Sequence, residues 1–355
     1  DVCVVSTAIP QANPEVHRAR EMGIPVIRRA EMLGELIRLQ TGVCIAGQHG
    51  KTTTTTMVAD VLTAGDADPT VINGGVLASL GSNARYGKGS YLVCEADESD
   101  GSFLSLSPTY ALITNLEGAD HLETWEGGMP ELQDAFAHFA NSVPFYGQVI
   151  LCKDDPYLEE LMHRITRPMV TYGIESDADF RAIDVVADGG CMRFSVVAYG
   201  EPLGDVMLSM AGNHNVLNAL GAIALAHGFG IAFSEVQTAL AQFAGVGRRY
   251  EIAGTFDGVM VVHDYGHHPH EIEAVLEATV RAWPERPIRA LFQPHRWSRL
   301  RDQWDGFCVC FDRTAEVVVS DVYPAGEDPI PSCAPDAFVA ATQAHGHRGA
   351  RYGGT

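Results

Sequence analysis

Short apolar segments alternate with helical patterns over most of the 355 residues, and this alternation constrains the fold more than any other feature. Chains of this kind form α/β layers in which parallel strands are joined by helices. The length exceeds that of one ordinary domain, so we expect two or three domains. The predicted strands are residues 2–6, 41–46, 90–95, 110–114, 148–152, 259–263, 288–293 and 315–321.

The alternation changes between residues 181 and 210, where glycines separate three strand-like runs. Glycine turns between short strands are typical of hairpins, so this segment predicts a small antiparallel insertion. Residues 243–249 follow a helical pattern and contain two glycines, as an interdomain linker would. We therefore expect domain boundaries near residues 40 and 247, which divide the chain into residues 1–39, 40–246 and 247–355.

Charge and cysteine content restrict the classes of protein. There are 45 acidic and 24 basic residues, for a net charge of -21. Such a field repels nucleic-acid phosphates and anionic lipids, and no apolar run reaches the roughly 18 residues of a membrane span, so we expect neither nucleic acid nor membrane as a partner. The eight cysteines show no CxxC spacing, which favours a reduced, cytoplasmic protein. The sequence opens inside a strand pattern without Met, and we expect a fragment cut at both ends.

A buried strand, a glycine-containing turn and a helix follow one another from residue 43 to residue 65. N–H groups at the helix start, the Lys51 ammonium and the Thr52 hydroxyl together can hold a polyphosphate and its Mg²⁺. The turn departs from a strict P-loop, which would have glycine in place of Ile45. The alternative is a structural glycine turn with an incidental lysine. The predicted nucleotide-binding residues of this turn are Gly47, Gln48, His49, Gly50, Lys51, Thr52 and Thr53.

Two further positions are candidates for metal binding. Glu95 ends a predicted strand, at the edge where a parallel sheet meets its ligand crevice, and is a candidate Mg²⁺ ligand. Four acidic residues within residues 95–100 equally fit a solvated loop. His121 follows a third strand, but imidazole is not a typical Mg²⁺ ligand, so spacing alone gives it little support.

Seven motifs, in order along nearly the whole chain, resemble those of the Mur ligase family. The chain resembles the branch that adds alanine, and it has no lysine between Lys88 and Lys153, where some relatives carry a carbamylated lysine. The motifs are GxxGKTTT at residues 47–54, EADESDGSF at 95–103, DH at 120–121, GNHNVLN at 212–218, GRRY at 247–250, DYGHHP at 264–269 and FQPHR at 292–296.

This resemblance implies a three-domain α/β architecture. Residues 1–39 would be part of an N-terminal Rossmann-like UDP-binding domain, residues 40–246 a central P-loop-type ATPase domain, and residues 247–355 an incomplete C-terminal Rossmann-like domain for the amino acid. The implied reaction is ATP-dependent ligation of L-alanine to the carboxylate of UDP-N-acetylmuramate, through an acyl phosphate, in peptidoglycan synthesis. We expect a monomer or a weak homodimer.

The resemblance also implies roles for single residues. Lys51 would serve the phosphates, and His267 is a candidate base. The approach to His121 is one residue longer than is usual in the family. The implied metal ligands are Thr52, Glu95 and His121, and the implied nucleotide contacts beyond the turn are Asn215, Asn218, Arg249 and Asp264. The implied amino-acid pocket consists of Tyr265, His267, Arg296 and Arg299. The catalytic candidates are Lys51, His267, Arg296 and Arg299.

Two alternatives stay open at the level of sequence. A recycling ligase would attach a preformed tripeptide to the same UDP sugar, and competition between alanine and tripeptide separates the two activities. A non-catalytic nucleotide-binding homologue would bind ATP without ligation. The presence of Lys51, Glu95, Asp264 and Arg296 together argues against the second alternative.

Overall fold

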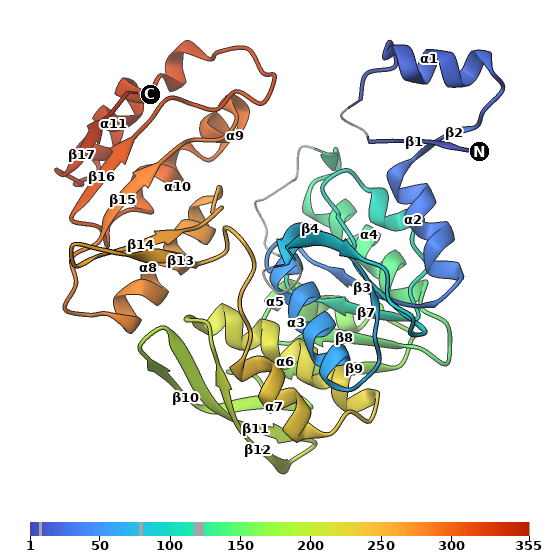
Figure 1. Ribbon diagram of the computed structural model, residues 1–355. Helices are drawn as coiled ribbons and strands as arrows, with labels where there is room; N and C mark the ends of the chain where they lie inside the picture. Colours follow the sequence, from blue (N-terminus) through green and yellow to red (C-terminus); the bar gives the residue numbers. More distant parts are fainter. Residues whose placement is uncertain (7–8, 78–80, 117–123, 355) are drawn as a thin grey trace. The chain divides into compact units, whose positions relative to one another are not determined.

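The computed structural model describes residues 1–6, 9–77, 81–116 and 124–354, which form two compact units (Figure 1). The first unit comprises Asp1–Asp184, Phe194–Val206 and Leu217–Val246, and the second comprises Val185–Arg193, Met207–Val216 and the chain from Gly247 onward. None of the described helices is long and apolar enough to cross a membrane.

A ten-stranded sheet with the order β12-β11-β10-β9-β8-β7-β3-β6-β4-β5 organises the first unit. Its central strands pair in parallel. The four strands predicted between residues 41 and 152 are present as β3, β6, β7 and β8, whereas β4, β5 and β9 are strands that the alternation did not predict. The strands are β3 (Thr41–Ala46), β4 (Thr70–Leu77), β5 (Ser82–Arg85), β6 (Tyr91–Glu95), β7 (Tyr110–Ile113), β8 (Gln148–Cys152), β9 (Met169–Gly173), β10 (Phe180–Asp188), β11 (Cys191–Ala198) and β12 (Glu201–Leu208).

The central strands are buried along almost their whole length, as parallel strands covered on both faces should be. In β3 the residues from Val43 to Ala46 have no exposed surface. Helix α3 packs against α7, while α4 packs against α5 and η1. The helices are α3 (Lys51–Ala64), α4 (Met129–Asn141), α5 (Pro156–Met162), α6 (Asn213–Gly228) and α7 (Phe233–Ala241), with the 3-10 turn η1 (Ser102–Ser105).

The structure contains the small antiparallel insertion predicted between residues 181 and 210. Three strands are present, and the short glycine turns make β10, β11 and β12 successive antiparallel neighbours. They are not a separate sheet, however, because β10 pairs in parallel with β9 through Phe180 and Arg181. The hairpins therefore extend the main sheet at one edge.

The N-terminal segment forms a small parallel pair, β1 (Cys3–Val5) and β2 (Val26–Arg28), around α1 (Pro14–Glu21). Helix α2 (Arg29–Arg38) packs against β3 and η1. Its Ile37 is 2% exposed and lies over Gly42, where an added Cβ would come within 2.5 Å of the Ile37 side chain. The absence of a side chain at Gly42 thus lets α2 approach the sheet.

The second unit contains a three-stranded parallel sheet in the order β15-β16-β17. Its core gathers aromatic side chains, among them Phe292, Phe307 and Phe338. The elements are α8 (Pro269–Ala282), β15 (Arg289–Phe292), α9 (Trp297–Asp302), α10 (Trp304–Val309), β16 (Glu316–Val319), the 3-10 turn η3 (Pro331–Cys333), α11 (Pro335–Ala344) and β17 (Ala350–Tyr352).

The strand predicted at residues 259–263 is present but does not belong to a parallel sheet. It is β14 (Val259–His263), and it pairs antiparallel with β13 (Glu251–Phe256). The two strands are joined by Asp257 and Gly258, both with positive φ (49° and 82°). Asp-Gly is a favoured two-residue hairpin connection, so local turn chemistry decides the pairing here.

Candidate functional site

The turn between β3 and α3 has the geometry of an anion-binding loop. Gly50 precedes α3 in the left-handed conformation, with φ at 79°. The first N–H groups of a helix have no partner within the helix and carry partial positive charge, so they favour a negatively charged ligand. Lys51 and Thr52 form the first turn of this helix. Gln48 and Thr53 are each 5% exposed and lie in the wall of the loop.

Two residues at the end of β7 fix this turn. Gln48 N–H donates to Asn115 O at 3.3 Å, and the Asn115 side chain accepts from His49 N–H and donates to His49 O. The Thr114 hydroxyl donates to His49 O at 2.7 Å. Gly47, with φ at 129°, passes so close that a Cβ would lie 2.1 Å from Thr114 Oγ1. Sequence reasoning assigned no role to Thr114 or Asn115.

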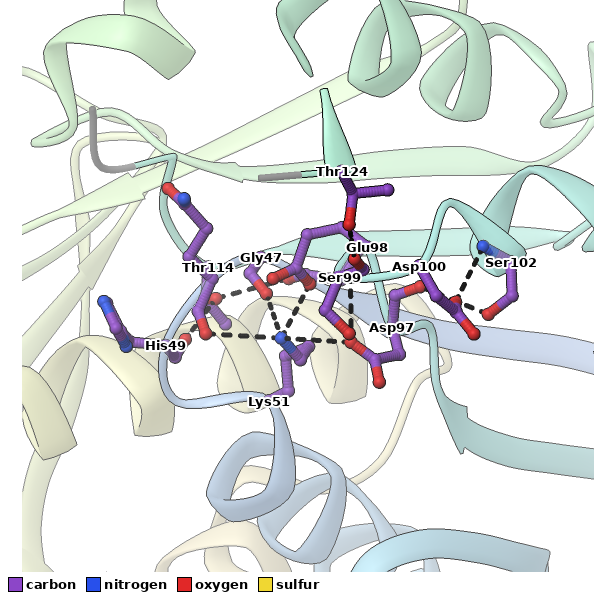
Figure 2. A network of polar contacts seen from close by, with 12 residues as sticks. Gly47, His49, Lys51, Asp97, Glu98, Ser99, Asp100, Ser102, Thr114 and Thr124 are labelled. Carbon is purple, nitrogen blue, oxygen red and sulfur yellow. Dashed lines mark hydrogen bonds and ion pairs between the residues drawn. The ribbon is translucent and has the colours of Figure 1, made fainter. Parts of the chain in front are cut away.

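The Lys51 ammonium lies at the centre of a polar network (Figure 2). It donates to Gly47 O at 2.7 Å, to Gln48 O at 3.2 Å and to Glu98 Oε2 at 2.6 Å. Asp97 Oδ1 lies 4.0 Å away. Burial acts to lower the pKa of Lys51, but the carboxylates of Glu98 and Asp97 outweigh it and raise the pKa, so Lys51 is charged at neutral pH.

Thr52 and Glu95, both expected at the metal, are in direct contact. The Thr52 hydroxyl donates to the Glu95 carboxylate, which also accepts from the Gly74 N–H. Burial raises the pKa of Glu95 despite these donors and the charge of Lys51, and its Oε1 has no hydrogen-bond partner among the described residues. A carboxylate whose charge is incompletely balanced, beside a hydroxyl, fits a hard divalent cation such as Mg²⁺. Within the described ranges no cluster of three or more His, Cys, Asp or Glu side chains is arranged to hold a metal.

The acidic segment after β6 is only partly a solvated loop. Glu98 is fully buried, whereas Asp100 is exposed and accepts the Ser102 N–H at 3.0 Å. Phe103, with no exposed surface, packs on Phe136 and anchors the segment. Sequence reasoning identified Glu95 but gave no role to Glu98, whose burial depends on this anchor.

Asn215 and Asn218 lie in the first turns of α6 and are 2% and 6% exposed. Asn218 Oδ1 sits against the phosphate loop, where a Cβ on Gly50 would come within 2.6 Å of it. The Asn215 amide nitrogen donates to Ala211 O at 2.7 Å and contacts His214 Nε2 at 3.0 Å. Burial lowers the pKa of His214 to about 4, so its ring is neutral and accepts this hydrogen bond at neutral pH.

In the second unit, Asp264 organises the turn after β14. Its carboxylate accepts the N–H groups of Tyr250 at 2.7 Å and Gly266 at 2.6 Å. Burial raises the pKa of Asp264 against these donors. Arg249 lies 3.7 Å from the Glu271 carboxylate and places its guanidinium 5.6 Å from the centre of the Tyr265 ring. Asp264 and Arg249 therefore both contact the turn after β14, through Gly266 and Tyr265 respectively.

Three of the four residues expected at the amino acid share one cluster of aromatic and imidazole rings. The Tyr265 and His267 ring centres are 5.2 Å apart, and the His267 and His295 ring centres are 6.3 Å apart. Arg299, 8% exposed, donates to His295 Nδ1 at 3.3 Å. Burial, together with the nearby arginines, lowers the pKa of His295. Sequence reasoning left His295 without a role, although it stands inside the FQPHR motif.

Arg296 has an unusual backbone. Its φ is 71°, a region that residues with a Cβ rarely enter, and its N–H donates to Tyr323 O at 2.9 Å. It immediately precedes α9, whose first turn is held by Ser298 hydrogen-bonded to Glu327. Strain of this kind is concentrated at functional sites.

The structure thus gathers most of the predicted site residues around Lys51 in the first unit and around Tyr265 in the second, whereas Asn215 lies in the part of α6 that belongs to the second unit and contacts Ala211 and His214. The prediction of His121 as a metal ligand lies outside the described residues. Of the nucleotide contacts, Asn218 lies against the phosphate loop, while Arg249 and Asp264 lie in the second unit.

Comparison with known proteins places nearly the whole chain in one family. Residues 1–41 match the model described as the Mur ligase family catalytic domain, residues 45–226 match the Mur ligase middle domain, and residues 248–352 match the Mur ligase glutamate ligase domain.

Among similar curated proteins is the UDP-N-acetylmuramate--L-alanine ligase of Geobacter sulfurreducens, 49% identical over 352 residues, which cover 99% of this chain and 76% of that protein. The protein of the same name from Acidithiobacillus ferrooxidans is 50% identical over 351 residues, covering 98% of this chain and 75% of its own length. The crystal structure of the Thermotoga maritima UDP-N-acetylmuramate-alanine ligase superposes with a TM-score of 0.84 at 30% identity, over 99% of this chain and 76% of the other. The chain belongs to the Mur ligase family.

Proposed function

We propose that this chain catalyses the ATP-dependent ligation of L-alanine to the carboxylate of UDP-N-acetylmuramate in peptidoglycan synthesis. The observation that carries this proposal is the contact between Thr52 and Glu95 beside the Lys51 ammonium, at the start of a helix. Identities of 49% and 50% to two alanine ligases support alanine as the amino acid.

The chemistry requires activation because a carboxylate has oxide as its leaving group and does not accept an amine at neutral pH. In the proposed first step, a carboxylate oxygen of the sugar attacks the γ-phosphorus of ATP, and ADP leaves. The alanine amine then attacks the acyl carbon of the resulting acyl phosphate, the amine loses a proton, and phosphate leaves with the C–O electron pair. Positioning and charge neutralisation account for most catalysis in such phosphoryl transfers.

Residues of the first unit supply that neutralisation. Lys51 places a full positive charge beside the loop, and the α3 N-terminus adds N–H donors. Thr52 and Glu95 would hold Mg²⁺, together with His121 as a third proposed ligand; when bound, the ion supplies charge neutralisation for the phosphates. Asn215 and Asn218 would contact the adenine, and Arg249 and Asp264 the nucleotide.

Residues of the second unit would hold alanine. Arg299 and Arg296 suit the amino-acid carboxylate, because a guanidinium group can donate two parallel hydrogen bonds. His267 Nδ1 contacts two acceptors, Tyr265 O at 3.1 Å and Glu271 Oε2 at 3.4 Å, and so carries the proton. Its Nε2 is then the basic nitrogen, which supports His267 as the group that receives the amine proton.

Phosphate release from ATP, measured with UDP-N-acetylmuramate and each candidate amino acid, tests the proposal. We expect release that requires both the sugar and alanine. A tripeptide that outcompetes alanine would instead identify the recycling reaction, and ATP binding without any release would identify a non-catalytic homologue. We further propose that the protein acts in the cytoplasm as a monomer or a weak homodimer.

A further inference from the structure

All three protons of the Lys51 ammonium are already engaged within the protein (Figure 2). An ammonium group has three N–H donors, and here they reach two backbone carbonyl oxygens, of Gly47 and Gln48, and one oxygen of Glu98. A phosphate oxygen therefore receives a hydrogen bond from Lys51 only when it replaces one of these partners.

Glu98 is the partner that a phosphate would replace. The two carbonyl oxygens are neutral and belong to a turn that Thr114 and Asn115 hold in place. Glu98 is charged and comes from a different segment, the one that follows β6. A polyphosphate brought to the turn places like charge beside this carboxylate, in a setting where burial weakens solvent screening.

The surroundings of Glu98 favour a role for the ion pair beyond stabilising the fold. Its side chain is fully buried, yet Oε1 has no hydrogen-bond partner among the described residues. Burying a half-satisfied carboxylate is costly, so a buried pair of this kind is weak evidence for a purely stabilising role. The backbone keeps Glu98 facing inward, because Gly101 N–H donates to Glu98 O at 3.0 Å and Phe103 anchors the segment.

We infer that Glu98 is a positioning residue that holds the Lys51 ammonium in an ion pair until nucleotide phosphates take the place of its carboxylate. The inference rests on the proposed function only in identifying the ligand as a nucleotide. The inference predicts that removing the Glu98 charge strengthens nucleotide binding. Turnover does not rise in parallel, because ADP then leaves more slowly.

Calorimetric titration of ADP in the presence of EDTA tests this, because without Mg²⁺ the ammonium is the main cation at the phosphates. We expect Glu98→Gln to bind ADP about tenfold more tightly, the equivalent of one charge-assisted hydrogen bond no longer contested. The matched control is Asp100→Asn, in the same segment but exposed, which should change affinity less than about twofold. In the ligation assay, the Michaelis constant for ATP should fall while kcat stays equal or falls.

Repeating the ADP titration in a Lys51→Ala variant shows whether Glu98 acts through Lys51. If it does, Glu98→Gln raises ADP affinity by less than about threefold in the Lys51→Ala variant. The same tenfold gain in both backgrounds would overturn the inference, because it would mean direct repulsion of the phosphate. Unchanged or weaker ADP binding by folded Glu98→Gln would also overturn it.

Thermal unfolding establishes that each variant is folded before titration. Should Glu98→Gln fail to fold, Glu98→Asp serves in its place: it keeps the charge but withdraws it from Lys51, and we expect about threefold tighter ADP binding. Unchanged affinity in Glu98→Asp would then overturn the inference. Because ADP binding needs neither sugar nor amino acid, the titration can be interpreted even if the proposed ligation does not occur.

Discussion

Replacing Gly74 with alanine should disable the proposed metal site while leaving the fold intact. Gly74 lies in β4, and an added Cβ would stand 2.6 Å from Glu95 Oε2, whereas ordinary contacts begin at 3.4 Å. The carboxylate must therefore move by about 0.8 Å, the difference between these two distances. Misplacement by about 1 Å can cost roughly 100-fold in rate, so we expect kcat to fall about 30- to 100-fold.

The cost in stability should be small, because the clash is with the far end of a flexible side chain rather than with the backbone. We expect the free energy of unfolding to fall by about 1 kcal/mol, at the low end for overpacking. Steady-state phosphate release across a Mg²⁺ titration gives the rate, and urea unfolding gives the stability. Gly228→Ala is the matched control, since its added methyl group meets only Gln148 Oε1 at 3.4 Å. If Gly74→Ala keeps its kcat and Mg²⁺ dependence within twofold of the parent, Glu95 does not act where we place it.

Three further predictions follow from the same geometry. Lys51→Ala should lower turnover about 100-fold or more, since it removes the charge beside the phosphates, and a variant that keeps over half the parent turnover would refute the assignment. Arg296→Lys should raise the Michaelis constant for alanine far more than that for ATP, because lysine lacks the planar fork, and an effect on ATP alone would move Arg296 to the nucleotide. Burial lowers the pKa of His214 from 6.5 to about 4 in the folded protein. Between pH 6.5 and pH 4 the unfolded chain therefore binds a proton that the folded protein does not. As a result, the free energy of unfolding is highest above pH 6.5 and falls as the pH drops towards 4. The full shift corresponds to about 3 kcal/mol, and because His214 is only partly buried we expect a loss of about 1–3 kcal/mol. Urea unfolding should show the free energy of unfolding falling more steeply with decreasing pH in the parent protein than in His214→Gln. Equal slopes in the two proteins would contradict this prediction.

Local pattern predicted the strands well where burial is continuous. Residues 41–46, 110–114 and 148–152 are apolar runs, and they became β3, β7 and β8 because helices cover both faces of the parallel sheet. Pairing partners were harder to predict: β10 joins β9 and extends the main sheet, whereas β14 pairs with β13 across an Asp-Gly turn. Both outcomes depend on neighbours that are chosen in three dimensions, which periodicity does not encode.

The candidate site shows the same division. The GKT turn and Glu95 were recognisable because a strand end and a helix start determine where they lie. Glu98, Thr114 and His295 were not assigned roles, since their contacts depend on burial and on segments distant in sequence. A carboxylate within an acidic run carries no sign in the sequence that it will turn inward to a lysine.

Transfer of a labelled oxygen tests the central claim, activation of the sugar carboxylate by ATP, most directly. UDP-N-acetylmuramate labelled with ¹⁸O in its carboxylate is incubated with the protein, ATP, Mg²⁺ and alanine, and the released phosphate is analysed by mass spectrometry. The account predicts one ¹⁸O atom in the phosphate for each amide bond formed, because the attacking carboxylate oxygen leaves with the phosphoryl group. Amide formation accompanied by unlabelled phosphate would contradict it.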